Sequence, residues 1–262
     1  MIKTIFLFIL LMTGTSYGAV TVTELLQLED RINAVYSSEL MEKEATLEFV
    51  FNTDSKILNA FAKKETPKEW KITIHGGFIS HPKMNYNSMA LILCHELGHF
   101  LGGRPFVEGR RLTPTMVSRA PKEMSVEGQA DFFATAECGK RVLAGEQPAF
   151  EITTFEQESI FCNSASDPDL CKVLHQASKR VIDIYTDAVR AITGYDYPYV
   201  NYNRKDPLVV ERSLIYVGEY PTLQCRLDTM AAGIDCKLDS SGKCVLENGE
   251  LVEKRPACWF KP

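Results

Sequence analysis

The 262-residue chain lacks a basic excess, since 29 Lys and Arg stand against 34 Asp and Glu. Proteins that bind nucleic acid or anionic membranes usually carry such an excess, so we expect neither partner. The sequence also has no internal repeat and no low-complexity tract. Its 45% apolar and 24% charged residues argue against wholesale disorder and against a coiled-coil rod. What remains is a globular protein with one main domain.

Long apolar runs are scarce as well. The longest, residues 5–12, is far shorter than the roughly 20 residues that cross a bilayer, so no stable membrane span is expected. Lys3 precedes this run, and the small residues Ser16 and Gly18 lie three and one positions before Ala19. This layout is typical of a secretory signal peptide. The sequence therefore predicts that residues 1–18 are removed on export to the periplasm or the extracellular medium.

None of the eight cysteines belongs to a CxxC pair, so a zinc site built from cysteines is not expected. An even number of cysteines in an exported chain favours disulfides. Cys162 and Cys171 flank a polar stretch and could close a local loop. Four others lie near the C-terminus, where apolar periodicity is weak. We therefore expect a main domain at 19–220 and a disulfide-stapled C-terminal extension at 221–262, packed on the core.

The pattern of apolar residues predicts an α+β fold. Helical periodicity favours helices over 25–41, 89–101, 125–143 and 169–192, and alternation favours strands over 45–51 and 71–80. Residues 56–63 are typical of a short helix or an extended turn. Gly76 and Gly77 interrupt the second strand, and such a pair marks a bulge, a close approach of another backbone, or a simple turn. The prediction is a mainly helical core with a small sheet beside the helix over 89–101.

That helix contains His95-Glu96-Leu97-Gly98-His99, an HExxH motif. Residues four apart lie on one face of a helix, so both imidazoles can bind one metal ion while Glu96 reaches a water. Apolar residues flank the motif, which predicts a buried helix whose polar groups need partners. A catalytic zinc site usually has three protein ligands, so one more is required.

A carboxylate must supply this third ligand, because no further His follows at the spacing of the longer HExxHxxGxxH motif. Glu127 and Asp131 lie four residues apart at the start of the next predicted helix and therefore share a face. One of them can bind zinc while the other accepts a hydrogen bond from a ligand imidazole. Glu108 and Glu123, in the preceding loop, rank below Glu127.

HELGH followed by ExxAD resembles the gluzincin zinc metallopeptidases, specifically the family of CAAX prenyl proteases, HtpX and Oma-type proteases. The similarity covers roughly residues 57–227. It includes the NAFA segment at 59–62, a glycine-containing strand at 72–80 and Tyr220-Pro221 with Arg226, which is similar to the family's HP....R element. The lack of membrane helices separates this chain from the integral-membrane members.

The resemblance implies a zincin-type metallopeptidase domain with one zinc ion per chain. It makes His95, His99 and Glu127 the ligands, Glu96 the catalytic base and Asp131 the carboxylate that orients a ligand histidine.

The resemblance also implies a place for the substrate. An extended peptide would add to the sheet edge along Ile74, His75, Gly76 and Gly77. Where the family has His before Pro, this chain has Tyr220, whose hydroxyl could donate to the oxyanion, although a packed aromatic is the more ordinary role. Other candidate donors, which the sequence does not rank, are His175, Arg204 and the tyrosines of residues 194–202.

These observations predict an exported zinc-dependent endopeptidase that cleaves protein or peptide substrates with a zinc-activated water and Glu96 as general base. The alternative is a zinc-binding chaperone-like or partner-binding protein with vestigial peptidase activity. The intact Glu96 argues against it, because a structural zinc site needs no base. A protein with a fortuitous HExxH and no metal is a third interpretation, which the second motif disfavours.

Overall fold

The computed structural model describes residues 19–108, 123–147, 162, 165–196, 198, 200–201, 203–216, 219–238, 244–245 and 255–261. The predicted signal peptide at 1–18 lies outside this part of the chain. Among the described residues, no helix has the length and apolar character needed to span a membrane.

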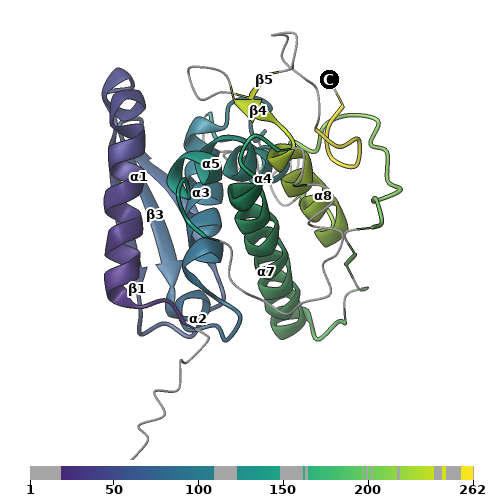
Figure 1. Ribbon diagram of the computed structural model, residues 1–262, viewed down its shortest axis with the longest axis horizontal. Coiled ribbons are helices and arrows are strands. Elements are labelled where there is room, and N and C mark those ends of the chain that lie inside the picture. The colour runs from purple at the N-terminus through teal and green to yellow at the C-terminus, as the bar shows by residue number, and fades with distance from the viewer. Residues whose placement is uncertain are drawn as a thin grey trace, which may run out of the picture.

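The fold is α+β, with a small sheet on one side of a mainly helical body (Figure 1). Its elements in chain order are α1 (Val22–Glu42), β1 (Thr46–Asn52), β2 (Ala60–Thr66), β3 (Glu69–His75), α2 (Gly76–Ile79), α3 (Tyr86–Leu101), α4 (Glu127–Phe133), the π-helical turn η1 (Ala134–Cys138), α5 (Gly139–Val142), α7 (Pro168–Thr193), α8 (Leu223–Ile234), β4 (Lys237–Leu238) and β5 (Cys244–Val245).

The three-stranded sheet has the order β1-β3-β2. β3 lies in the centre, parallel to β1 and antiparallel to β2, and its apolar side chains Trp70, Ile72 and Ile74 are buried. Trp70 stacks on Phe100 of α3 with 4.9 Å between ring centroids, so the sheet packs directly on that helix.

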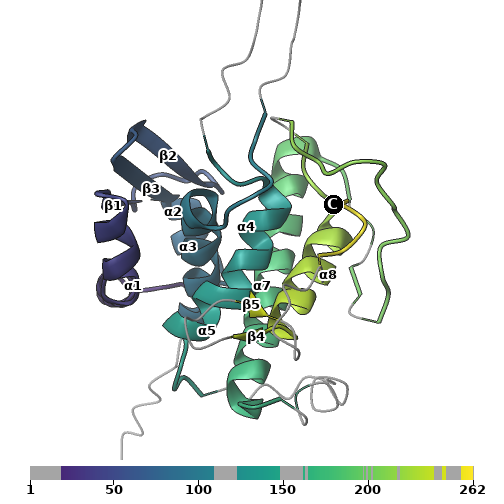
Figure 2. The same ribbon diagram turned by 90° about the horizontal axis from the view of Figure 1, so that it is seen from above.

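Helix α3 is the centre of the molecule and lies between the sheet and the pair α7–α8 in both views (Figure 1; Figure 2). Nearly all its side chains are buried, as expected for a central helix whose residues are mostly apolar. Asn85 and Ser88 form a reciprocal cap at its start, with two hydrogen bonds of 2.9 Å. Gly98 allows α4 to approach, because an added Cβ would lie 2.9 Å from Ala130 Cα.

Three disulfides connect described residues. Cys162–Cys171 closes the local loop that the sequence predicted and ends on the first turn of α7. Cys94–Cys138 joins α3 to η1, and Cys225–Cys258 joins α8 to the C-terminal segment. The prediction of a disulfide-stapled C-terminal region is therefore confirmed.

Helix predictions were mostly confirmed, but the sheet differs from the prediction. Residues 60–63, expected in a helix or extended turn, belong to β2. The second predicted strand ends at His75, and Gly76 and Gly77 begin α2 instead of continuing it. These two glycines permit a close approach of the segment between β1 and β2. A Cβ added at Gly76 would lie 2.2 Å from Thr53 O, and one added at Gly77 would lie 2.3 Å from Ile57 O.

The C-terminal region contains a 12-residue helix, α8, that the sequence analysis missed. Leu223, Leu227 and Met230 of α8 belong to the same apolar core as α3 and α7. In the structure, the segment that follows residue 220 is thus partly built into the core.

Candidate metal centre

Three potential ligands converge from two helices. His95 and His99 lie on one face of α3, and Glu127 opens α4. His95 Nε2 is 3.4 Å from Glu127 Oε2, and His99 Nε2 is 3.7 Å from Glu127 Oε1. One ligand atom from each of these residues lies within 4.8 Å of the other two. The helix spacing that the sequence predicted therefore produces a compact His-His-Glu cluster.

This cluster fits a tetrahedral metal ion. Zinc bonds of about 2.1 Å at tetrahedral angles place neighbouring ligand atoms about 3.4 Å apart. The two imidazole–carboxylate separations, 3.4 and 3.7 Å, are close to that value. The donor set of two imidazoles and one carboxylate also matches zinc chemistry. The residues present therefore suit a zinc ion.

The far nitrogen of each imidazole has a hydrogen-bond partner. His99 Nδ1 donates to the carbonyl of Ser125 at 2.8 Å, and His95 Nδ1 donates to Asp131 Oδ1 at 2.9 Å. These bonds leave both Nε2 atoms turned toward Glu127. Such hydrogen bonds fix the tautomer and orientation of metal-binding histidines. Asp131 makes the contact that the resemblance implies for it. Ser125 contributes its backbone carbonyl, a contact that no sequence motif predicts.

Asp131 is held in turn by Arg226 of α8. The guanidinium donates from Nε to Asp131 Oδ2 at 2.7 Å and from Nη2 to Oδ1 at 2.8 Å. Its outer face lies over the Tyr185 ring, 4.4 Å from the centroid. Asp131 is fully buried, so this pair supplies the charge compensation that a buried carboxylate requires.

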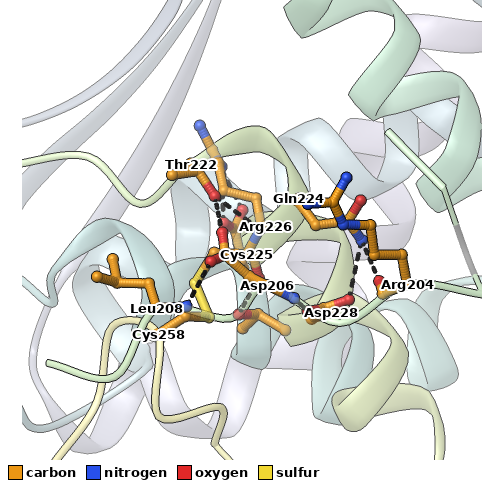
Figure 3. Close-up of a disulfide and its surroundings, with 11 residues drawn as sticks. Arg204, Asp206, Leu208, Thr222, Gln224, Cys225, Arg226, Asp228 and Cys258 are labelled. Carbon is orange, nitrogen blue, oxygen red and sulfur yellow. Dashed lines mark hydrogen bonds and ion pairs between the residues drawn. A yellow bond between two sulfur atoms is a disulfide. The ribbon is translucent and has the colours of Figure 1, made fainter. Parts of the chain in front are cut away.

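The first turn of α8, which carries Arg226, is anchored by two features (Figure 3). Thr222 caps the helix by accepting from the Cys225 backbone N–H at 3.0 Å, and its hydroxyl donates to Asp206. The disulfide from Cys225 to Cys258 lies immediately beside Arg226 in the chain. Arg226 thus extends from a helix end that is held both by hydrogen bonds and covalently.

The C-terminal segment that holds Cys258 also packs on α4. Trp259 lies against Gly128, the residue after Glu127, so closely that an added Cβ would lie 2.2 Å from its indole. Arg255 donates to Gln129 Oε1 at 2.8 Å. The start of the helix that carries the third ligand is therefore supported by residues from the C-terminus.

Charges shift several pKa values in the cluster. Burial lowers the pKa of His95, but Asp131 and Glu127 outweigh it and raise the pKa to about 10. Burial raises the pKa of Glu127, but His95 and His99 outweigh it and hold that pKa far below its usual range. Burial also raises the pKa of Glu96, an effect that the neighbouring histidines oppose. The carboxylates of this buried cluster thus favour a positive charge on His95.

A cleft of about 550 Å³ opens at this cluster and is bordered by His95, Glu96, His99, Glu127 and Arg226. Glu96, which is almost completely buried, therefore lies at the cleft beside both histidines. Residues 58–62 of β2 and its approach form one border, and Tyr185 and its neighbours on α7 form another.

The predicted substrate strand is wrong. Ile74 and His75 belong to β3, which is hydrogen-bonded to β1 on one side and β2 on the other, so no further strand can add there. Gly76 and Gly77 are helical. The strand beside the cleft is β2, which pairs with β3 alone among the described strands. The error came from the order of strands in the sheet. β3 follows β2 in the chain but lies in the centre of the sheet, and β2 lies at its edge.

Tyr220 is 62% exposed and lines the cleft, so it is not a packed aromatic residue. Glu127 is the main cause of its altered acidity, because a phenolate would lie beside a carboxylate, and this raises the pKa of Tyr220 to about 12. The Tyr220 hydroxyl therefore stays protonated at neutral pH, and it hydrogen-bonds to Glu127. The other described donor candidates, His175, Tyr195 and Arg204, are not among the residues that line the cleft. Tyr197, Tyr199 and Tyr202 lie outside the described part of the chain.

The competing ligands are elsewhere. Glu108 forms an isolated β-bridge with Tyr216, and the Glu123 carbonyl accepts from Lys64. A second group, Cys162, Cys171 and His175, also has ligand-type atoms within 4.8 Å. Its two sulfurs form a disulfide, which removes the thiolates that a metal would need.

Comparison of the chain with protein-family models, curated proteins and solved structures finds no match.

Proposed function

We propose that the protein is an exported zinc-dependent endopeptidase of gluzincin type. The observation that carries the proposal is the convergence of His95, His99 and Glu127 with the buried Glu96 at an open cleft. His95, His99 and Glu127 would hold the ion, with Asp131 orienting His95. The earlier resemblance to the family of CAAX prenyl proteases, HtpX and Oma-type proteases supports the same assignment. When bound, zinc supplies Lewis acidity, which polarises a substrate carbonyl and makes water more acidic.

The chain's own residues would perform the proton transfers and position the substrate. The Glu96 carboxylate accepts a proton from the attacking water and returns it to the leaving amine. The Tyr220 hydroxyl donates to the carbonyl oxygen as negative charge develops there. A substrate backbone pairs with the open side of β2, in place of the β3 edge that the sequence suggested.

Export is supported by the covalent structure. The three disulfides between described residues are consistent with an oxidising compartment, where such bonds form and persist. Removal of a signal peptide at 1–18 belongs to the same proposal.

The competing proposal is a zinc-binding chaperone-like or partner-binding protein with vestigial activity. It shares the metal site and differs in Glu96, which such a protein would not use. Glu96 is nonetheless buried at the cleft beside both histidines, where its desolvation is costly. The peptidase proposal gives this buried carboxylate a role as the base, and the binding-protein proposal gives it none, so Glu96 favours the peptidase.

The test combines metal analysis with cleavage of casein by the mature chain. We expect one zinc per chain, loss of zinc in Glu127→Ala, and retained zinc without cleavage in Glu96→Gln. Glu219→Gln is the matched control, because Glu219 lines the same cleft outside the ligand cluster. Chelation should abolish cleavage, and added zinc should restore it. Folded protein without zinc would refute the metal site, while equal cleavage by Glu96→Gln would refute the mechanism.

A further inference from the structure

One wall of the cleft is an apolar stripe on α7. Tyr185, Ala188, Val189 and Ile192 all line the cleft, and their spacing of i, i+3, i+4 and i+7 places them on one helix face. This spacing makes them neighbours along the helix rather than scattered contacts. We call these four residues the α7 stripe.

The α7 stripe begins at the metal centre and ends in solvent. Its first member, Tyr185, lies beneath the guanidinium of Arg226, which binds Asp131. Seven residues of helix carry the stripe about 10 Å to Ile192. Ile192 is 78% exposed, so the stripe leads out of the cleft instead of ending in the core.

Apolar groups also border the cleft opposite the α7 stripe. Phe61 of β2 is 39% exposed, and Ala60 and Ala62 on either side of it line the cleft as well. Figure 2 shows β2 and α7 on opposite sides of α3 and α4. Exposed apolar residues that cluster around a concave site usually mark a surface that binds an apolar ligand.

The charges of the cleft disfavour an acidic ligand. Three carboxylates line it, from Glu96, Glu127 and Glu219. Arg226 is the one Lys or Arg side chain among the described cleft residues, and it is buried and bound to Asp131. Away from the proposed zinc ion, an acidic side chain entering the cleft would therefore meet like charge, with no described lysine or arginine of the cleft free to pair with it.

Resting on the peptidase function proposed above, we propose a substrate class for this cleft. It selects an extended polypeptide segment with a bulky apolar side chain, such as Leu, Ile, Phe or Met, next to the scissile bond. The backbone of the segment follows the open side of β2, and the apolar side chain packs on the α7 stripe. Pairing with β2 requires an extended backbone, and packing on the α7 stripe requires an apolar side chain.

The test measures binding separately from cleavage. Fluorescent ten-residue peptides carry Leu, Ser or Glu in turn at each of the four central positions, and bind to the mature Glu96→Gln protein. One position should show Leu preferred over Ser by about 10-fold or more, the usual discrimination of an apolar pocket, with Glu weakest. Val189→Lys on this background should abolish the preference for Leu and strengthen binding of the Glu peptide.

Two further variants guard against a loss of folding. Ile192→Lys changes an exposed position of the same stripe and should shift the preference in the same direction. Val209→Lys is the matched control, since Val209 is 73% exposed and is not among the cleft residues, and it should leave the preference unchanged.

The outcomes separate the two proposals. Equal binding of the Leu, Ser and Glu peptides, or no binding, overturns the substrate class even if the wild-type chain cleaves casein. A Leu preference that Val189→Lys removes supports the substrate class even if no peptide is cleaved by wild type, in which case only the peptidase function fails. A preference that survives both stripe variants also overturns the assignment.

Discussion

Replacing Arg226 with Met would leave the carboxylate of Asp131 buried without its guanidinium partner. Asp131 has no exposed surface, and both of its oxygens accept from Arg226, at 2.7 and 2.8 Å. Removing one partner of a buried ion pair costs about 3–5 kcal/mol, because the other charge stays in the low-dielectric interior. We expect Arg226→Met to lower the free energy of unfolding of the metal-free protein by about that amount.

Arg141 offers a closely matched control for this substitution. It pairs with Glu39 at 2.7 Å and lies over the Tyr36 ring at 4.3 Å, so it also combines an ion pair with an aromatic contact. Its side chain is 25% exposed, however, and Glu39 is partly exposed too. Because exposed pairs contribute only about 0–1 kcal/mol, Arg141→Met should cost far less than Arg226→Met.

Urea unfolding followed by circular dichroism measures both costs, and competition with a chromophoric chelator measures zinc affinity. Arg226→Met should weaken zinc binding by about 10- to 100-fold, as is usual when the group behind a ligand histidine is disturbed. Adding Asp131→Asn should recover part of the stability, since a neutral amide needs no counter-charge, but not the zinc affinity. A loss of stability no larger than that of Arg141→Met, with unchanged zinc affinity, would refute this account of the site.

The remaining predictions concern a disulfide and a buried histidine. Replacing Cys225 and Cys258 together by Ser should weaken zinc binding by about 10-fold in the same competition assay. The same change at Cys162 and Cys171 should not, because only the first pair adjoins Arg226. Equal zinc affinities in the two variants would contradict this. Burial lowers the pKa of His175 to about 4, against about 6.5 when unfolded, so the unfolded state binds more protons between these values and stability falls as pH drops from about 6.5 to 4. His175→Gln should flatten that dependence of the urea midpoint, and an unchanged slope would exclude His175 as its source.

Features set by local sequence were predicted well. The helix expected over 89–101 is α3, and the one expected over 169–192 is α7, which ends at Gly194 in a left-handed conformation. Periodicity, caps and a terminal glycine all act within a few residues, so they are visible in the sequence. The placing of His95 beside His99 was predictable for a similar reason, because both lie on one face of one helix. Glu127 lies on another helix and was assigned by the resemblance.

The sheet shows where local reasoning fails. The sequence of β2, three apolar residues followed by four polar ones, does not alternate between apolar and polar, and none of its residues is fully buried. Its pairing with β3 is what makes it a strand. Strand order is a property of the whole sheet, and the sequence analysis therefore took a central strand for the edge beside the cleft.

Arg226 and Asp131, which are separated by 95 positions, demonstrate the same limit in the site itself. The resemblance to an HP....R element drew attention to Arg226, but its contact with Asp131 depends on α8 packing against α4. Residues that hold the centre thus come from α3, α4 and α8, and Trp259 supports α4 from beyond them. Because Arg226 and Trp259 both follow residue 220, a fragment of residues 19–220 would keep all three proposed ligands and Asp131 but lose the side chains that hold Asp131 and support α4. The proposed zinc site therefore requires the C-terminal region, and an assay on that fragment would not test it.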